Sequence, residues 1–342
     1  MKFKKTTAVL AAATLALLGA CSNPEPSNDP TGDNTGGGST TLNITILPKN
    51  LGNPYFDTST KGAVAAAAEI GATTSEVGPT AGAADAQVPY IQTATQQRVS
   101  AIEIAANDQT ALCDALDAAM AAGVKVVTFD SDAPGCRDLF INQAESAGIA
   151  KVLVEMVAEQ VGDAGQIAIL SATANATNQN AWIELMQADL AANHPNIELV
   201  KIAYGDDDDQ KSYDETAALL QSYPELKGIV APTTVGILAA ARYLSASQAK
   251  GQVALTGLGT PNDMRPYVQD GTVQEFALWN PEDLGYLTTY AVQALVNGTI
   301  TGAQGDTFAA GKLGSFTVGP DHTVLLGDPY RFNAENIANF NF

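Results

Sequence analysis

Strand-like and helix-like segments alternate through most of this chain. Short apolar stretches are followed by longer, Ala-rich stretches with the periodicity of amphipathic helices. Strands are expected at residues 42–47, 101–105, 124–129, 166–171, 198–203, 228–231 and 253–257, and helices at 55–70, 109–122, 147–161, 178–192, 214–222 and 236–245. Because strands that alternate with helices pair in parallel, the pattern predicts an α/β fold with helices on both sheet faces.

The alternation runs twice. It passes through residue 129, restarts near residue 147, and covers a body from about residue 42 to 342. A body of roughly 300 residues fits two domains better than one. We therefore expect two doubly wound parallel-sheet lobes. The body has no apolar run of about 18 residues, so we do not expect it to span a membrane.

The N-terminal segment, residues 1–20, has the pattern of an export signal. Three lysines precede an apolar run of about 15 residues, which is short for a transmembrane helix. The run ends in Leu-Gly-Ala-Cys at Cys21, which resembles the lipobox of bacterial lipoproteins. An ordinary secretory signal that ends near a cysteine is the alternative. Residues 21–41 are polar and predict a lipidated Cys21 followed by a flexible tether.

The chain is strongly acidic, with 17 basic and 37 acidic residues and a net charge of −20. Such a charge disfavours nucleic acid and anionic lipid as partners but leaves a neutral ligand possible. Four consecutive acids, residues 206–209, could suggest a calcium loop. Because they lack the alternating ligand spacing, the glycine and the distal Glu of such a loop, we expect a solvated surface loop.

Two cysteines remain once Cys21 is set aside, and an exported protein meets oxidising conditions. We expect a disulfide between Cys113 and Cys136, with two separate buried thiols as the alternative. In the chain-entropy description, closing a loop of about 22 residues stabilises the fold by about 3 kcal/mol.

Polar and aromatic residues follow the expected strands. In open α/β sheets, ligands bind beyond the carboxyl ends of the strands. The residues at those positions are Lys49 with 53–56, then 106–107, 130–132, 178–180, 232–234 and 260–262. Amides and carboxylates pair with hydroxyl groups, and aromatic faces cover the apolar side of a sugar ring. The mixture favours a polyhydroxylated small molecule as ligand.

Enzyme chemistry is not expected at these positions. The body's two histidines, His194 and His322, lie away from the strand ends, and no nucleophile elbow, phosphate-binding loop or metal-ligand spacing occurs. Asp130 and Asp132 could act as paired carboxylates, but alternate residues that leave a strand point in opposite directions. A binding carboxylate at Asp130 and a structural one at Asp132 is the interpretation. We predict no catalytic residue, no metal and no cofactor.

An ordered set of motifs resembles a known family. The set covers the whole body, with Cys113 and Cys136 in matching places, and consists of Lys49, Asn-Pro-Tyr-Phe at 53–56, Thr-Phe-Asp-Ser-Asp at 128–132, and residues 141–143, 178–182 and 261–268. It resembles the type I periplasmic sugar-binding proteins of ABC importers, in the branch that holds the rhamnose-binding and autoinducer-2-binding proteins.

The resemblance implies two α/β lobes joined by a three-strand hinge that close on ligand. The crossings are expected near residues 142–143, 257–259 and 278–280. Lobe one then holds residues 42–143 and 258–280, and lobe two holds residues 144–257 and 281–342.

The resemblance also implies the ligand residues. The autoinducer-2 branch uses a Lys, two Asp, a Gln and a Pro-x-Ala segment, but Asn178 here replaces the second Asp and Thr234 replaces the Ala. The motifs around both positions look like those of the rhamnose-binding branch. We therefore expect a rhamnose-like sugar, with autoinducer-2 or a ribose- or xylose-like sugar as alternatives. The implied ligand-binding residues are Lys49, Asn53, Phe56, Asp130, Asn178, Gln179, Pro232, Thr234 and Trp279.

The implied function is an extracytoplasmic solute-binding lipoprotein that delivers its sugar to an ABC permease and ATPase complex. We expect a monomer attached to the membrane only through the lipid anchor. A receptor that senses the ligand without transport is a more remote alternative.

Overall fold

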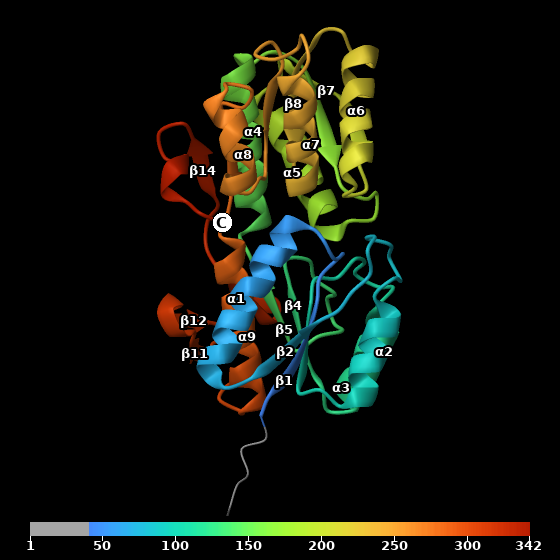
Figure 1. Cartoon of the computed structure of the whole chain (residues 1–342), viewed down its shortest axis with the longest axis vertical. Coiled ribbons are helices and arrows are strands. Elements are labelled where there is room, and N and C mark those ends of the chain that lie inside the picture. The colour runs from blue at the N-terminus through green and yellow to red at the C-terminus, as the bar shows by residue number, and fades with distance from the viewer. Residues whose placement is uncertain (1–40) are drawn as a thin grey trace, which may run out of the picture. The chain divides into compact units, whose positions relative to one another are not determined.

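A computed structural model describes residues 41–342 (Figure 1). The expected signal segment, the lipidated Cys21 and all of the tether except residue 41 lie outside the described residues. Within residues 41–342, no helix is both long and apolar enough to cross a membrane.

The first lobe is built on a six-stranded parallel sheet with the strand order β13-β5-β4-β3-β1-β2. Its strands are β1 (Asn43–Leu47), β2 (Thr73–Glu76), β3 (Ala101–Ile104), β4 (Lys125–Phe129), β5 (Leu139–Asn142) and β13 (Thr323–Leu325). Helices α1 (Pro54–Ile70) and α9 (Pro281–Val296) cover one face, and α2 (Val88–Gln97) and α3 (Cys113–Ala121) cover the other (Figure 1). The disulfide between Cys113 and Cys136 forms as expected and ties α3 to the loop after β4.

The second lobe has a four-stranded parallel sheet with the order β7-β6-β8-β9. The strands are β6 (Gly165–Ser171), β7 (Ile197–Tyr204), β8 (Leu226–Ala231) and β9 (Ala254–Gly257). Its helices are α4 (Ser146–Val161), α5 (Thr177–Asn193), α6 (Asp209–Ser222), α7 (Thr234–Ser245) and α8 (Pro261–Gln269). Strand β10 (Glu275–Leu278) lies beside β9 and pairs antiparallel with β14 (Tyr330–Asn333). The described chain therefore contains the two doubly wound lobes that the alternation predicts.

Short elements complete the region after α9. Strands β11 (Thr307–Ala309) and β12 (Ser315–Thr317) form a small antiparallel pair. Three 3₁₀ turns accompany them at Gly311–Leu313, Pro320–His322 and Ile337–Asn339.

Helices α1 and α9 approach each other closely because of two glycines. A Cβ on Gly62 would lie 1.8 Å from the carbonyl oxygen of Glu282, and a Cβ on Gly285 would lie 1.9 Å from that of Ser59. Helix α1 begins where the Asn53 side chain accepts a hydrogen bond from the Tyr55 amide at 3.1 Å, which satisfies one of the free amides of the first turn. This cap fixes the start of α1, and therefore fixes where its first residues project.

All of the expected strands and helices are present, with ends shifted by a few residues. The unpredicted elements include β2 and α2, which are largely exposed and so carry little apolar periodicity. The sequence pattern also predicts no strand or helix after residue 257, where α8, β10, α9 and four later strands occur.

The expected lobe boundaries are wrong in the last third of the chain. Residues 258–280 were expected in lobe one, but α8 packs on α7, and β10 contacts β9 and α4, in lobe two. Residues 281–342 were expected in lobe two, but α9 packs on α1 and β13 joins the six-stranded sheet. Only the end of that segment, including β14, belongs with lobe two.

The crossings explain this difference. The chain does pass between lobes near residues 142–143 and 278–280, as expected, but it stays in lobe two at 257–259. The remaining crossing follows β13, where the Leu326 amide donates to the Asn142 carbonyl at 2.9 Å and Gly327 donates to Gln143 at 3.3 Å. The Gly-Leu-Gly sequence at residues 257–259 indicates that a strand ends there, but it does not indicate which sheet the next strand joins.

Candidate functional site

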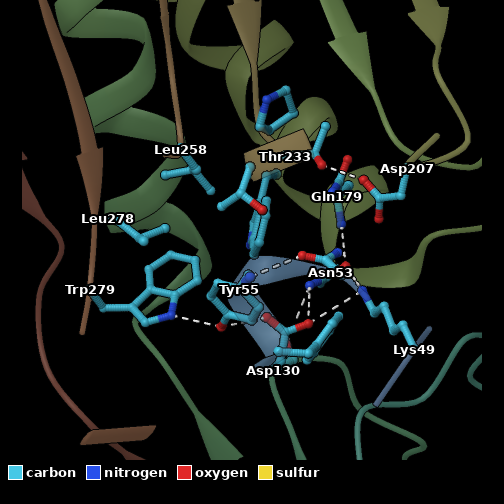
Figure 2. Close-up of a pocket in the computed structure, with 15 residues that line it drawn as sticks. Lys49, Asn53, Tyr55, Asp130, Gln179, Asp207, Thr233, Leu258, Leu278 and Trp279 are labelled. Atoms are coloured by element: carbon cyan, nitrogen blue, oxygen red, sulfur yellow. Dashed lines mark hydrogen bonds and ion pairs between the residues drawn. The ribbon is translucent and has the colours of Figure 1, made fainter. Parts of the chain in front are cut away.

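A cavity lies between the two lobes (Figure 2). Its lining residues are Lys49, Asn53, Tyr55, Phe56, Asp130, Asn178, Gln179, Trp182, Asp207, Pro232, Thr233, Thr234, Leu258, Leu278 and Trp279. All nine residues that the sequence predicts as ligand-binding are among them. The structure thus brings the predicted set together at one place.

The position of the cavity follows from the sheet topology. Lys49 follows β1 and Asp130 follows β4. Gln179 lies in the first turn of α5, which comes after β6, and Thr233 follows β8. The carboxyl ends of parallel strands lie at one edge of each sheet, and the two edges face each other here. Trp279 comes from the crossing segment between β10 and α9.

Polar side chains of the two lobes bond directly across the cavity. The Lys49 Nζ donates to Asn178 Oδ1 at 3.0 Å and lies 3.3 Å from Asp130 Oδ1. Asn178 Nδ2 in turn donates to Asp130 Oδ1 at 3.3 Å. Lys49 and Asp130 belong to lobe one and Asn178 belongs to lobe two, so these three groups link the lobes.

Tyr55 connects this polar cluster to the crossing segment. Its hydroxyl donates to Asp130 Oδ2 at 2.9 Å and accepts from the Trp279 indole N–H at 2.8 Å. Burial and the neighbouring Asp130 charge raise the pKa of the Tyr55 hydroxyl well above its usual value. Tyr55 therefore stays neutral and fixes one Asp130 oxygen, which leaves Oδ1 directed at Lys49 and Asn178.

Gln179 and Asn53 use part of their hydrogen-bonding capacity within the fold. Gln179 Oε1 accepts from the Ser171 hydroxyl at 2.7 Å and from the Ala172 amide at 2.8 Å. Asn53 Oδ1 caps helix α1 through Tyr55. Because both carbonyl oxygens are occupied, each side chain presents its NH₂ group as the remaining donor.

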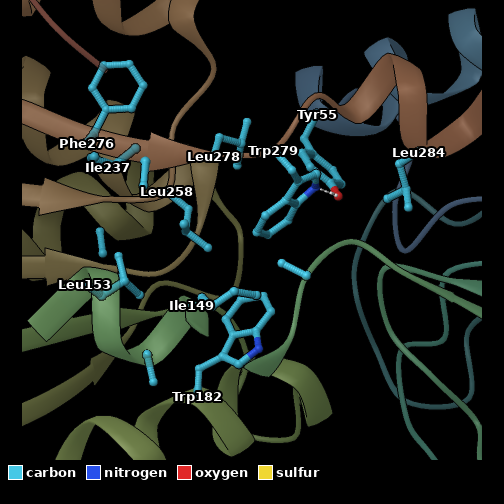
Figure 3. Close-up of a cluster of buried hydrophobic side chains, with 14 of the residues drawn as sticks. Tyr55, Ile149, Leu153, Trp182, Ile237, Leu258, Phe276, Leu278, Trp279 and Leu284 are labelled. Atoms are coloured by element: carbon cyan, nitrogen blue, oxygen red, sulfur yellow. Dashed lines mark hydrogen bonds between the residues drawn. The ribbon is translucent and has the colours of Figure 1, made fainter. Parts of the chain in front are cut away.

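Aromatic rings form the apolar side of the cavity (Figure 3). Tyr55 makes edge-to-face contacts with Phe56 and Trp279 at centroid distances of 5.0 and 6.1 Å. Trp182 on α5 lies 6.2 Å from Trp279. Leu258 and Leu278 extend this wall. Since Trp279 and Trp182 are the only tryptophans of the chain, intrinsic fluorescence reports on this cavity.

Sequence reasoning missed six lining residues. Tyr55, Trp182 and Thr233 lie inside the recognised motifs or strand-end segments but have no predicted role of their own. Leu258 and Leu278 have no distinctive local pattern. Asp207 was expected in a solvated loop, and for this one residue the expectation is wrong because its carboxylate accepts a hydrogen bond from Thr233 inside the cavity. Because residues 206–209 are all Asp, their sequence does not show which of the four side chains lines the cavity.

Other titratable groups that the sequence singled out lie outside the cavity. Asp132 pairs with Arg137 at 2.7 Å, which matches the structural role expected of it. His194 contacts Asp163 at 2.6 Å, and His322 contacts the Gly302 carbonyl at 2.7 Å. Within residues 41–342, no group of three or more His, Cys, Asp or Glu side chains is placed to hold a metal ion.

Comparisons with known proteins agree with this arrangement. The model of the periplasmic binding protein domain matches residues 44–300. A solved sugar ABC transporter protein from Actinomyces odontolyticus is 52% identical, covering 88% of this chain and 98% of that chain with a TM-score of 0.72. An ABC transporter solute-binding protein from Clostridium phytofermentans with bound L-rhamnose is 38% identical, covering 88% and 98% with a TM-score of 0.85.

A third structure is LsrB from Clostridium saccharobutylicum in complex with AI-2. It is 25% identical and covers 88% of this chain and 100% of that chain, with a TM-score of 0.82. Because the family model matches more than half of the sequence, the chain belongs to the periplasmic binding protein family, and within it to the sugar-binding proteins of ABC transporters. Proteins of this family work outside the cytoplasm, hold sugars and interact with a permease.

Proposed function

We propose that this chain is the solute-binding lipoprotein of an ABC sugar importer and that it holds a monosaccharide in the cavity between its lobes. The observation that carries the proposal is that donors and acceptors from both lobes converge on one cavity with an aromatic wall. A ligand that bonds both lobes favours the conformation in which all of these groups are close. Ligand binding and lobe closure are therefore coupled.

The chemistry of the cavity suits a ring that carries hydroxyl groups. Asp130 Oδ1 accepts, Lys49 donates, and Asn178 does both, so adjacent hydroxyls of a sugar can bond to this cluster. Gln179 and Asn53 add further donors. Phe56 and Trp279 cover the apolar face of the ring, while Pro232 and Thr234 border it from lobe two.

L-Rhamnose is the first candidate ligand. The relative from C. phytofermentans was solved with this sugar, and the Asn178 amide and Thr234 hydroxyl differ from the Asp and Ala of the autoinducer-2 branch. L-Rhamnose is a 6-deoxy sugar, and Leu258 and Leu278 offer an apolar wall for its methyl group. Matching a methyl group to an apolar wall avoids burying an unpaired hydroxyl there.

A matched pair of sugars tests this assignment. L-Mannose has the same ring as L-rhamnose but carries a hydroxyl on carbon 6. We expect L-rhamnose to stabilise the purified body against heat, by about 2.7 kcal/mol at one hundred times its dissociation constant. L-Mannose should bind at least about tenfold more weakly by calorimetry, since its extra hydroxyl would be buried without a partner. Equal affinity for the two sugars would remove the argument for a deoxy sugar.

The same measurements separate the alternatives. Autoinducer-2, D-ribose and D-xylose belong in the panel, and a clear preference for one of them would replace L-rhamnose as ligand while keeping the cavity. Recovery of the sugar unchanged after long incubation would exclude turnover. Transport by the reconstituted permease and ATPase, dependent on this protein, distinguishes an importer component from a receptor that only senses its ligand.

The membrane attachment is part of the proposal. The lipobox-like Leu-Gly-Ala-Cys sequence and the polar residues after it support a protein anchored by lipid at Cys21 and exposed on the outer side of the membrane. We propose that the body works as a monomer, and its sedimentation at micromolar concentration tests this. A stable dimer in solution would contradict it.

A further inference from the structure

The turn after β7 carries four consecutive acids, residues 206–209, and only one of them lines the central cavity. The other three have partners elsewhere. Asp208 caps helix α6 through the Lys211 amide at 2.7 Å, and the two remaining ion pairs are Asp206 with Lys211 at 2.5 Å and Asp209 with Arg242 at 2.8 Å. The cavity-lining residue is Asp207. The contacts that hold the turn to helices α6 and α7 come from its three neighbours and not from Asp207.

The backbone of this turn directs Asp207 inward. Asp206 and Asp207 both adopt left-handed conformations, with φ values of 56° and 52°. The turn is held to the end of β6 because the Gly205 amide donates to the Ser171 carbonyl at 2.9 Å and the Asp206 amide donates to Ala172 at 3.1 Å. Asp and Asn tolerate the left-handed region better than most residues. The turn therefore fixes where the Asp207 side chain lies (Figure 2).

The Asp207 carboxylate is half-buried and has few hydrogen-bond donors. Thr233 donates to Oδ1, and within residues 41–342 no hydrogen bond reaches Oδ2. Burial raises the pKa of Asp207, while the Thr233 hydrogen bond and the Lys49 charge oppose that rise only in part. A half-buried carboxylate with one free oxygen on a cavity wall is stabilised by a ligand hydroxyl that donates to it.

The charges of the cavity lead to the same conclusion. Among its lining residues, Lys49 is the only base, and it already lies 3.3 Å from Asp130. Asp207 is the second acid, so the lining carries one negative charge that no lining base neutralises. This charge disfavours an anionic ligand, and a neutral ligand with hydroxyl donors meets the condition by donating to the free carboxylate oxygen.

We propose that Asp207 is a ligand-contacting residue of lobe two, which accepts a hydrogen bond from one ring hydroxyl of the sugar and so helps to determine specificity. Asp130 of lobe one and Asp207 of lobe two then hold the ring from opposite sides. This inference rests on the proposed sugar-binding function.

The test compares Asp207→Asn with Asp206→Asn. The two variants remove the same charge from adjacent residues in the same backbone conformation, but only Asp207 faces the cavity. We expect Asp207→Asn to bind L-rhamnose about 10- to 100-fold more weakly by calorimetry. Asp206→Asn should bind within about twofold of the wild type. Equal affinity of Asp207→Asn and wild type would overturn the inference.

Deoxy analogues of the sugar separate direct contact from an indirect effect. If Asp207 accepts from one hydroxyl, its substitution should have little effect on binding of the analogue that lacks that hydroxyl, and should weaken the others. A loss that is equal for the 1-, 2-, 3- and 4-deoxy analogues would refute direct contact. Thr233→Val is a second variant in case Asp207→Asn does not fold. It should weaken the binding of the same analogues, by a smaller factor. If the wild type binds no sugar, the proposed function fails instead.

Discussion

Glu103 provides a test of the energetics that does not depend on any ligand. It lies on β3 in the middle of the six-stranded sheet, between β1 and β4, and is 1% exposed. Its described hydrogen bond comes from the Thr289 hydroxyl on α9 at 2.8 Å. Burial raises the pKa of the Glu103 carboxyl from 4.5 to about 8, and Thr289 offsets this rise only partly.

The sign of the pH dependence follows from proton binding. Between pH 4.5 and about 8 the folded protein keeps the Glu103 proton while the unfolded chain has released it. Stability from this group is therefore complete below pH 4.5 and is lost as the pH rises towards 8. The rise of the Glu103 pKa from 4.5 to about 8 corresponds to about 5 kcal/mol across that window.

The perturbation is Glu103→Gln, which keeps the shape and a hydrogen bond to Thr289 but cannot ionise. Urea unfolding from pH 5 to pH 9 should show the variant gaining on the wild type by several kcal/mol as the pH rises. Glu69→Gln is the control, because the Tyr286 and Tyr290 hydroxyls lower the pKa of Glu69, and its effect lies below that range. Parallel profiles for wild type and Glu103→Gln would refute the reasoning.

Three further predictions concern the cavity, the disulfide and the anchor. Asp130→Ala should weaken sugar binding by about 1–3 kcal/mol. Asn178→Asp should also weaken sugar binding, because a donor is lost and a charge is added. If calorimetry shows unchanged affinity in both folded variants, the ligand binds elsewhere. Serine at both Cys113 and Cys136 should lower the unfolding free energy by about 3 kcal/mol, whereas equal urea midpoints and slopes would show that the bridge adds nothing. Cys21→Ala should release the protein from membranes. A variant that stays in the membrane fraction after washing would contradict lipid anchoring at Cys21.

Up to residue 257, the local pattern predicted every strand and helix except β2, α2 and β5, with ends that lie within five residues of the observed ones. Mostly apolar strands such as β3 and β6 are buried along all or most of their length, so their composition marks them. Helix α1 is marked by Asn53 and Pro54 at its start and by Gly71 at its end. These signals depend only on neighbours in the chain.

Lobe membership was not predictable in the same way. Strands β10 and β13 are short, and nothing in their residues distinguishes a strand that joins one parallel sheet from a strand that joins another. The choice depends on partners far away in the sequence, such as β9 and β14 for β10, and β5 for β13. The second expected crossing failed for this reason.

The candidate site also has a part that the sequence predicts and a part that depends on long-range contacts. The alternation of strands and helices predicts the α/β class, and the carboxyl ends of the strands mark the edge where a ligand binds. The nine ligand residues follow from the resemblance of the motifs to a known family, and all nine line the cavity. Only the tertiary structure decided that Tyr55 joins Asp130 to Trp279, and that Asp207 turns inward while its neighbours face solvent. Those facts depend on distances between residues far apart in the chain and on two left-handed backbone angles, which residue types alone do not specify.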